Sequence, residues 1–166
     1  GDTDDADPRP MIENLPIYWT KGPKPETGSR VPLGKAKVVV PGTDVTIVSY
    51  SRTVLESLGA LQALGEAGIS AEVIDLRTIQ PWDQETVIES VNKTGRLLVA
   101  HEAVVPFGAG AEIAAVVQEK CFGKLKAPVK RIGAPFNPVP FSKPLEAAHV
   151  TDGAKIAAAA IALVKG

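Results

Sequence analysis

The chain has 166 residues, of which 45% are hydrophobic and 22% are charged, a composition typical of a globular domain. Its formal net charge of −1 excludes the strongly basic balance of proteins that bind nucleic acid or an anionic membrane surface. A single cysteine, Cys121, excludes an internal disulfide framework, and no apolar run approaches the roughly 18 residues of a membrane span. We therefore expect neither a nucleic-acid partner nor a membrane partner.

The first 34 residues differ from the rest of the chain. They hold acids, many prolines and one short apolar stretch, MIENLPIYW at 11–19, which is too short to form a core. The segment 20–30 that follows contains glycine, proline and mixed charge, which predicts a linker or an extended arm. We expect residues 1–34 to be the end of a preceding domain plus a linker arm, and residues 35–166 to be one domain.

Strands and helices alternate from residue 35 onward. Apolar segments at 35–40, 45–50, 71–76 and 127–133 predict strands, and the near-continuous apolar run at 96–103 predicts a central strand buried on both faces. The spacing of apolar residues predicts helices over 53–65, 83–92, 108–122 and 151–164. This alternation predicts a three-layer α/β fold, an open and mostly parallel twisted sheet of about five strands with helices on both faces.

Local signals mark several helix ends. Thr53 with Glu56 predicts a capping box, and Asp83 predicts an N-cap across which Trp82 and a valine four residues into the helix form a hydrophobic staple. Gly95 predicts the end of that helix.

Polar residues gather where the predicted strands end, which in an open parallel sheet is where function concentrates. Arg77 ends the buried strand of VIDLRTIQPWD, and Asp75 shares its strand face and could pair with it. Arginine supplies a flat, bidentate donor that suits interfaces. We predict an interface to neighbouring domains or subunits that involves Ser49, Tyr50, Ser51, Arg77, His101, Phe107 and Lys126.

The residues alone predict no complete active site. The loop FGAGAE at 107–112 precedes a helix, so it is either a phosphate-binding loop or a tight turn in which glycines allow close packing. His101 and Glu102 point to opposite faces of a strand and cannot act as a pair. Two distant histidines and Cys121, which we expect in the core, make no metal site. We predict no catalytic, cofactor-binding or metal-binding residue in this chain.

Several motifs stand in a fixed order: VPLGKAKVV, GTDVTIVSYSRTV, VIDLRTIQPWD, RLLVAHEA, FGAGAEIAAVVQEKCF and APVKRIGAP. Together they resemble the C-terminal domain, of the transketolase C-terminal type, in the beta subunit of thiamine-diphosphate-dependent 2-oxo acid dehydrogenases. The resemblance covers about Val31 to Val164. MIENLPIYW resembles the last strand of the domain that precedes it in this family.

The resemblance implies that the whole enzyme is an oxidoreductase acting on pyruvate, a branched-chain 2-oxo acid or acetoin, in the bacterial cytoplasm or the mitochondrial matrix. Its thiamine diphosphate and magnesium are held by other domains, so this chain alone is expected to be inactive and to bind neither. The implied partners are the alpha subunit, a second beta subunit and the peripheral subunit-binding domain of an acyltransferase.

One position departs from the family. The residue before Ala127 is usually acidic there and is associated with docking of the acyltransferase, but here it is Lys126, which puts that contact in doubt. Two alternatives remain open. The chain could belong to another thiamine enzyme of the transketolase or deoxyxylulose-phosphate synthase type, or it could be a free-standing small-molecule binding module that uses the FGAGAE loop.

Overall fold

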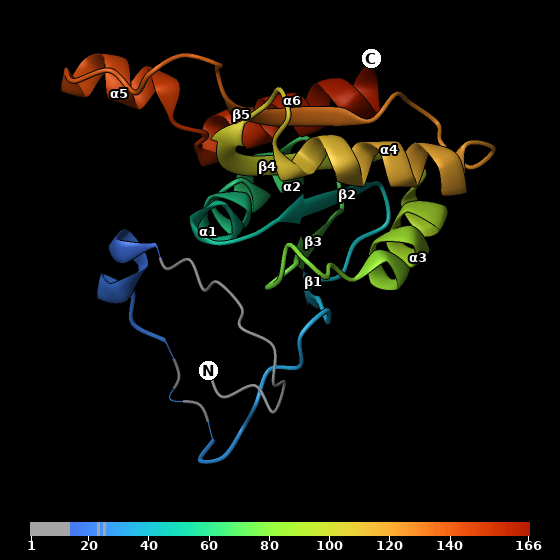
Figure 1. The fold of residues 1–166 in the computed structure, drawn as a ribbon. Helices are drawn as coiled ribbons and strands as arrows, with labels where there is room; N and C mark the ends of the chain where they lie inside the picture. The colour runs from blue at the N-terminus through green and yellow to red at the C-terminus, as the bar shows by residue number, and fades with distance from the viewer. Residues whose placement is uncertain (1–13, 23, 25) are drawn as a thin grey trace.

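The computed structural model describes residues 14–22, 24 and 26–166. Within this part of the chain, five strands form one open sheet in the order β1-β3-β2-β4-β5 (Figure 1). Only the edge strand β1 is antiparallel to its neighbour, and the other described pairs are parallel. The strands are β1 (Lys37–Val40), β2 (Val45–Ser49), β3 (Ala71–Asp75), β4 (Leu97–Val104) and β5 (Lys130–Ala134).

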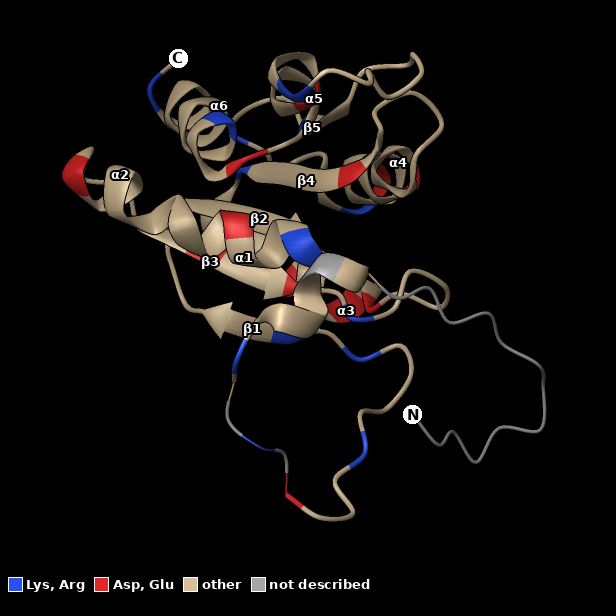
Figure 2. Cartoon of the chain, turned by 90° about the vertical axis from the view of Figure 1, so that its left-hand side faces the viewer, with Lys and Arg blue, Asp and Glu red and all other residues tan. Residues whose placement is uncertain are grey.

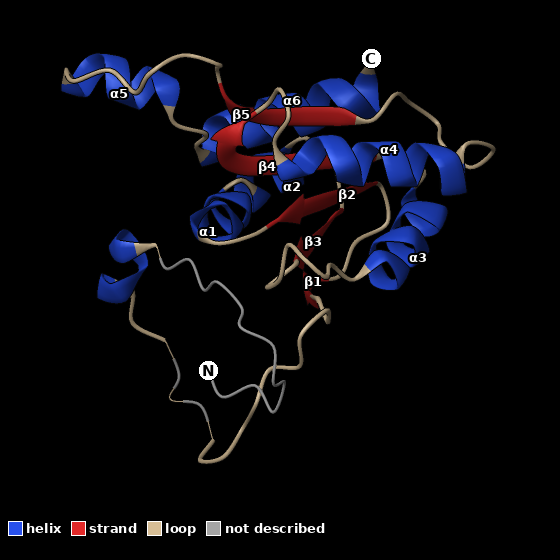
Figure 3. Cartoon of the chain, viewed as in Figure 1, coloured by secondary structure: helices blue, strands red, loops and turns tan. Residues whose placement is uncertain are grey.

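Helices cover both faces of the sheet, which confirms the predicted three-layer α/β architecture (Figure 3). The face that packs against the first core cluster carries α1 (Arg52–Gly59), α2 (Leu61–Glu66) and α6 (Gly153–Lys165). The opposite face carries α3 (Gln84–Thr94) and α4 (Ala109–Cys121). Two short elements, α5 (Lys143–His149) and the 3₁₀ helix η1 (Leu15–Trp19), lie outside these layers (Figure 1).

The central strands owe their continuous apolar sequence to burial on both faces. In β4, Leu98 and Ala100 enter the core cluster under α1 and α6, whereas Leu97 and Val99 enter the cluster under α3 and α4. Successive side chains on a strand point to opposite faces, so a strand covered on both sides has no polar alternate positions. The predicted central position of this strand is therefore confirmed.

The helix predicted over 53–65 is two helices, and the predicted capping box is wrong. The N-cap is Ser51, the Thr53 hydroxyl donates to the Tyr50 carbonyl at 2.7 Å, and the chain interrupts the helix at Ala60. The Glu56 carboxylate is engaged elsewhere, because it accepts the backbone N–H of Gly153 at the start of α6 at 3.1 Å. A tertiary contact thus overrides the local capping signal.

The signals around α3 are confirmed. The Asp83 carboxylate accepts the backbone N–H of Thr86 at 3.2 Å, and Trp82 and Val87 lie in the same core cluster. Gly95 ends the helix with φ of 74°, a conformation in which glycine carries no steric penalty.

Two segments differ from expectation. Residues 15–19 form η1 and not the strand that the resemblance implied, and no strand of the described residues pairs with them. Residues 11–13 of the same stretch lie outside the described part. Helix α5 was not predicted, since none of its residues is buried and it leaves no apolar period in the sequence.

The segment Lys143–Lys165 is long and apolar enough to cross a membrane by length and composition alone. The structure divides it into α5 and α6, with extended backbone at Val150 and an N-cap at Asp152. Helix α6 buries Ile156, Ala157 and Ala160 in the core, so the apolar character of that half is explained by packing against the sheet.

Candidate functional site

Three neighbouring strands run into turns of unusual backbone geometry at the carboxyl edge of the sheet. Ser51, Arg77 and Phe107 follow β2, β3 and β4 and have φ values of 58°, 60° and 60°. Within the described part of the chain, no other non-glycine residue has positive φ. Each such residue costs about 1 kcal/mol or more, and strain of this kind gathers at functional sites. All three residues belong to the predicted interface.

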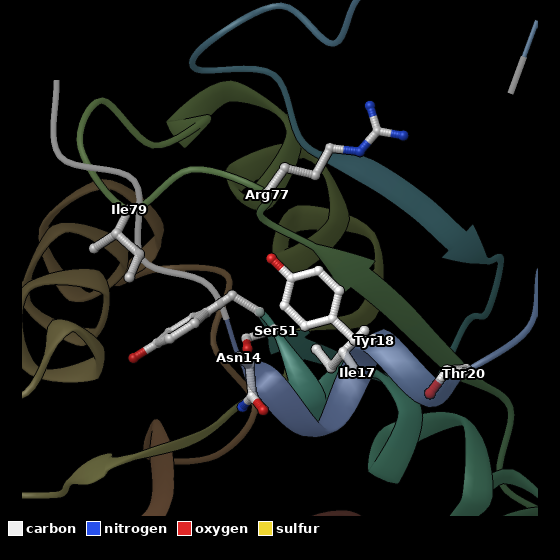
Figure 4. A pocket seen from close by; sticks show the side chains of 8 residues that line it. Asn14, Ile17, Tyr18, Thr20, Ser51, Arg77 and Ile79 are labelled. Carbon is white, nitrogen blue, oxygen red and sulfur yellow. The ribbon is translucent and has the colours of Figure 1, made fainter. Parts of the chain in front are cut away.

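A cleft of about 500 Å³ lies at this edge, between η1 and the strand ends (Figure 4). Both the arm and the α/β domain contribute to its wall. The lining residues are Asn14, Ile17, Tyr18 and Thr20 from the arm, and Tyr50, Ser51, Arg77 and Ile79 from the turns after β2 and β3. The arm therefore meets the carboxyl edge of the sheet in this structure.

Charged and amide side chains tie the arm to the edge. The Asn14 amide donates to Glu102 Oε2 at 2.7 Å, and Arg52 Nη1 lies 3.8 Å from Glu102 Oε1. Arg52 also pairs with Glu56, four residues further along α1, at 2.9 Å. Figure 2 shows residues of both signs of charge on α1 and an acidic residue near the end of β4. Each pair is about one-third exposed, so its contribution to stability is below about 1 kcal/mol.

Arg77 lies at the carboxyl edge of the sheet as predicted, but Asp75 contacts its backbone and does not form the expected side-chain pair. The Asp75 carboxylate accepts the backbone N–H of Arg77 at 3.0 Å and not its guanidinium. Burial raises the pKa of Asp75 above its ordinary value, against the effect of this hydrogen bond and of the nearby Arg77 charge. The exposed guanidinium points away from Asn14 and Ser51 (Figure 4) and makes no hydrogen bond or ion pair with another described residue.

Two of the predicted interface residues lie inside the domain. Ser49 and His101 are fully buried, so their side chains do not reach a partner directly. The Ser49 hydroxyl bonds that of Ser57 at 2.9 Å, and the His101 ring stacks against Tyr50 with centroids 6.0 Å apart. Ser49 is the last residue of β2, as predicted, but His101 lies three residues before the end of β4, which continues to Val104. Both are covered, so they support the edge from within.

The imidazole of His101 is neutral and closely enclosed. Its Nδ1 lies 2.9 Å from the Ala103 carbonyl, which makes Nδ1 the protonated nitrogen, while Nε2 has no partner among the described residues. Burial lowers the pKa of His101, and the nearby charge of Arg131 acts in the same direction. The residue therefore stays uncharged at neutral pH and lacks the accessible partner that a general base would need.

The glycines of the FGAGAE loop make room for this ring. A β-carbon at Gly110 would lie 2.5 Å from His101 Nε2, and one at Gly108 would lie 3.2 Å from Cε1. Gly133 of β5 closes the other side, where a β-carbon would lie 2.8 Å from Nδ1. Of the two explanations left open by the sequence, the tight turn with close packing fits this geometry.

Two aromatic residues shape the edge further. Phe107 is 93% exposed and meets Phe136 of the next connection edge-to-face, with ring centroids 6.5 Å apart. Tyr50 lines the cleft, and burial, followed by the nearby Glu102 charge, raises the pKa of its hydroxyl, which stays protonated and available as a donor. An exposed aromatic pair at the same edge of the sheet as the cleft suits a protein contact.

Lys126 lies at the opposite edge, after α4. Its backbone N–H donates to the Gly95 carbonyl at 2.8 Å, and its ammonium lies 3.4 Å from the Thr94 carbonyl at the end of α3. Cys121 is buried in the core as expected. The predicted interface residues thus do not form one surface, because Lys126 is separated from the carboxyl edge by the length of the sheet.

The described residues do not fit thiamine diphosphate with a divalent metal. No group of three or more His, Cys, Asp or Glu in this part of the chain could hold a metal ion. Gly110 of the glycine loop packs closely against the His101 ring. We derive no catalytic step through the cofactor in this chain, and the expectation that other domains bind it stays a prediction.

Sequence reasoning missed part of the site. Asn14 was not singled out, because its contact with Glu102 joins residues that lie 88 positions apart, and Arg52 was left out of the predicted interface. Glu102 was noted only as a neighbour of His101. One signal could have indicated its role. Glu102 lies near the end of the predicted strand 96–103 and Arg52 follows the predicted strand 45–50, so the two could form an ion pair at the edge of the sheet.

Comparison with known proteins identifies the domain. Residues 34–156 match the family model described as "Transketolase, C-terminal domain". The chain is 42% identical over 162 residues, 98% of its length, to the beta subunit of acetoin:2,6-dichlorophenolindophenol oxidoreductase of Cupriavidus necator, of which the match covers 48%. It is 50% identical over 119 residues to the mitochondrial 2-oxoisovalerate dehydrogenase subunit beta of Chaetomium thermophilum, which corresponds to 70% of this chain and 25% of that protein.

A third relative is the beta subunit of the pyruvate dehydrogenase E1 component of Bacillus subtilis, 42% identical over 140 residues, 84% of this chain and 43% of that subunit. Among solved structures, an inactive beta4 tetramer of a split-gene transketolase matches with a TM-score of 0.68 and 27% identity, over 83% of this chain and 44% of that one. The chain spans less than half the length of these relatives. It belongs to the family of transketolase C-terminal domains.

Proposed function

We propose that this chain is the C-terminal domain of the beta subunit of a thiamine-dependent 2-oxo acid dehydrogenase, and that it serves subunit assembly. The observation that carries the proposal is the match over 98% of the chain to a beta subunit, with further beta subunits for pyruvate and 2-oxoisovalerate at comparable identity. The whole enzyme is then an oxidoreductase whose chemistry takes place on other domains.

The geometry of the carboxyl edge supports an assembly role. Arg77 and Phe107 are exposed and have positive φ values. Arg77 also lines the cleft, and residues of the arm form part of its wall. An arginine that is desolvated at an interface typically contributes about 2 kcal/mol or more of binding free energy. We assign this edge to contacts with the preceding domain, the alpha subunit and a second beta subunit.

The remaining assignments follow from the same proposal. Thiamine diphosphate and magnesium are bound by the other domains of the full enzyme. Relatives include bacterial proteins and proteins described as mitochondrial, so the bacterial cytoplasm or the mitochondrial matrix is the proposed compartment. Docking of an acyltransferase at the position of Lys126 would need a contact different from the acid-based one that the resemblance implies.

Reconstitution tests the function. The whole beta subunit is co-expressed with its alpha subunit, and thiamine-dependent reduction of 2,6-dichlorophenolindophenol is measured with pyruvate, 2-oxoisovalerate and acetoin in parallel. We expect turnover with one of these substrates. The 166-residue chain alone should give no turnover and no calorimetric signal with thiamine diphosphate and magnesium. Turnover only with sugar phosphates would favour the transketolase alternative, and tight magnesium-dependent binding to the isolated chain would overturn the assembly role.

A further inference from the structure

Helix α5 stands apart from the three layers of the domain (Figure 1). None of its seven residues is buried, and neither core cluster of the described residues includes one of them. Isolated helices shorter than roughly 12–15 residues are marginal in water, so two turns of helix are not stable alone. The position of α5 therefore depends on a contact from outside the helix.

The ends of α5 offer little stabilisation of their own. The N-cap residue, Ser142, makes no side-chain hydrogen bond to the first turn, and Pro144 has no N–H to donate. At the other end the backbone of Val150 is extended, so the helix ends without a left-handed cap. Carbonyl oxygens of the last turn are thus left without helical partners and need a donor from elsewhere.

Lys155, in the first turn of α6, supplies that donor. Its ammonium donates to the carbonyls of Ala148 at 2.7 Å and Ala147 at 3.3 Å. The Val150 carbonyl accepts a third hydrogen bond, so all three N–H groups of the ammonium have a partner. Within the described part of the chain, no other side chain forms a hydrogen bond or an ion pair with α5.

The same lysine is badly placed for its own helix. It is the third residue after the N-cap Asp152, whose carboxylate accepts the Lys155 backbone N–H at 2.8 Å. The N-terminal end of a helix carries partial positive charge and repels a lysine, whereas the C-terminal end attracts one. The Lys155 side chain reaches from the positive end of α6 to the negative end of α5. Its charge therefore opposes one helix and stabilises the other.

The chain around α5 is anchored at its two ends only. Ala134 at the end of β5 is 6% exposed, and Thr151, just after α5, is 4% exposed. We define the α5 segment as residues 135–150, which lie between these two anchors. Its apolar side chains Phe141 and Leu145 are exposed and pack against neither core cluster. A segment of this kind can open locally while the sheet and its covering helices stay folded.

We propose that Lys155 is a latch for the α5 segment: its ammonium holds α5 against the start of α6, and loss of that positive charge releases the segment without unfolding the domain. The proposal is a conformational device within this chain. It goes beyond the function proposed above and does not rest on it, because the latch operates whatever reaction the whole enzyme performs.

Amide hydrogen exchange of the 166-residue chain, followed by NMR, tests the latch. The N–H groups of Glu146 and Val150 report on α5, because they bond the Ser142 and Glu146 carbonyls at 2.9 and 3.0 Å. Lys155→Met keeps the aliphatic stem and removes the charge. We expect exchange at these two amides to become about tenfold faster or more, since hydrogen bonds to a charged group are lost. Exchange in β4 should stay as in the wild type.

Matched variants separate the latch from a general effect of charge. Lys165→Met removes an equal charge from the last turn of α6, and it should change exchange in α5 by less than about twofold. Lys155→Arg keeps a cation with several N–H donors and should retain most of the protection. The urea midpoint of Lys155→Met should equal or exceed that of the wild type, because the repulsion at the start of α6 is removed.

Two results would overturn the proposal. Unchanged exchange in α5 of Lys155→Met would show that the helix does not need the ammonium. Equal acceleration in α5 and β4, with a lower urea midpoint, would show that Lys155 stabilises the whole domain and not one segment. Neither result bears on the reconstitution of the thiamine-dependent enzyme, so the two proposals fail separately.

Discussion

His101 and Gly110 approach each other so closely that a β-carbon at position 110 would lie 2.5 Å from the imidazole Nε2. The ring is fully buried and bonded to the Ala103 carbonyl, so it cannot move aside at low cost. We therefore predict that Gly110→Ala destabilises the chain by about 1–3 kcal/mol through overpacking, measured by urea denaturation. Gly65→Ala is the control: it lies in α2 with open space around it, and there alanine should leave stability equal or raise it by up to about 1 kcal/mol. Equal effects of the two variants would contradict the packing role of Gly110.

The same histidine predicts how stability depends on pH. Burial lowers the pKa of folded His101, so the unfolded chain, with a value near 6.5, takes up a proton at higher pH than the folded chain. The free energy of unfolding is therefore fully present above about pH 6.5 and falls as the pH drops below that value. The charged group that acts on the ring is Arg131 on β5, and Tyr50, which has Glu102 nearby, stacks against the ring.

Urea denaturation at pH 7.5 and 5.5 checks this expectation. The wild-type chain should be less stable at pH 5.5, and His101→Gln should lose most of that difference. His149→Gln, at the other histidine, should keep it. A His101→Gln variant with the wild-type pH dependence would show that another group controls the transition.

A buried carboxylate on β3 carries a further prediction. Burial raises the pKa of Glu72, but hydrogen bonds from Lys93, Ser90 and Gly42 together outweigh burial and hold the pKa below its ordinary value of 4.5. Lys93→Met keeps the aliphatic stem and removes the charge, which leaves Glu72 with fewer partners at 3% exposure. We expect a loss of about 1–3 kcal/mol at pH 7, which shrinks as the pH falls below about 4.5 and Glu72 is protonated in both states.

Lys120→Met provides the comparison for Lys93→Met. The Lys120 ammonium bonds the Gln84 side chain at the surface at 2.9 Å, so its removal should change the free energy of unfolding by less than about 0.5 kcal/mol. Similar losses for the two lysines would mean that Glu72 does not depend on its ion pair.

Arg77 tests the assembly surface. The Arg77 guanidinium makes no hydrogen bond or ion pair with the described residues, and an alanine at this position would have the same positive φ. Arg77→Ala should therefore leave the stability of the isolated chain within about 0.5 kcal/mol of wild type. In the whole subunit it should weaken assembly, seen in analytical ultracentrifugation as a shift to smaller species on dilution. Clear destabilisation of the isolated chain with assembly unchanged would make Arg77 a packing residue.

The elements that could be predicted are those whose burial and ends are determined by residues within the element itself. Strand β4 is apolar without interruption because both of its faces are covered, and α3 carries its cap at Asp83 and its stop at Gly95 within its own sequence. The break at Ala60 could not be read from the sequence in this way. It lies where Gly153, 97 residues from Glu56, brings the start of α6 against α1.

The candidate site was predictable in outline only. Parallel topology brings the residues after β2, β3 and β4 to one edge, so Ser51, Arg77 and Phe107 were found there. Which of the neighbouring side chains are exposed depends on how turns fold over them, and this is why Ser49 and His101 lie inside. The glycines of FGAGAE allow two explanations, and the close approach of the His101 ring favours the tight turn.

The contact between α6 and α1 limits how far the domain can be shortened. The family match ends at residue 156, but α6 continues to Lys165, and beyond that point Ala157 and Ala160 still fill the core under β2 and β4. A truncation at 156 would remove one of the three helices on this face and uncover part of Leu64 and Ile47, which α6 now helps to cover. We therefore expect the last ten residues, although they follow the family match, to be needed for a stable fold, and an excised version of the domain should retain them.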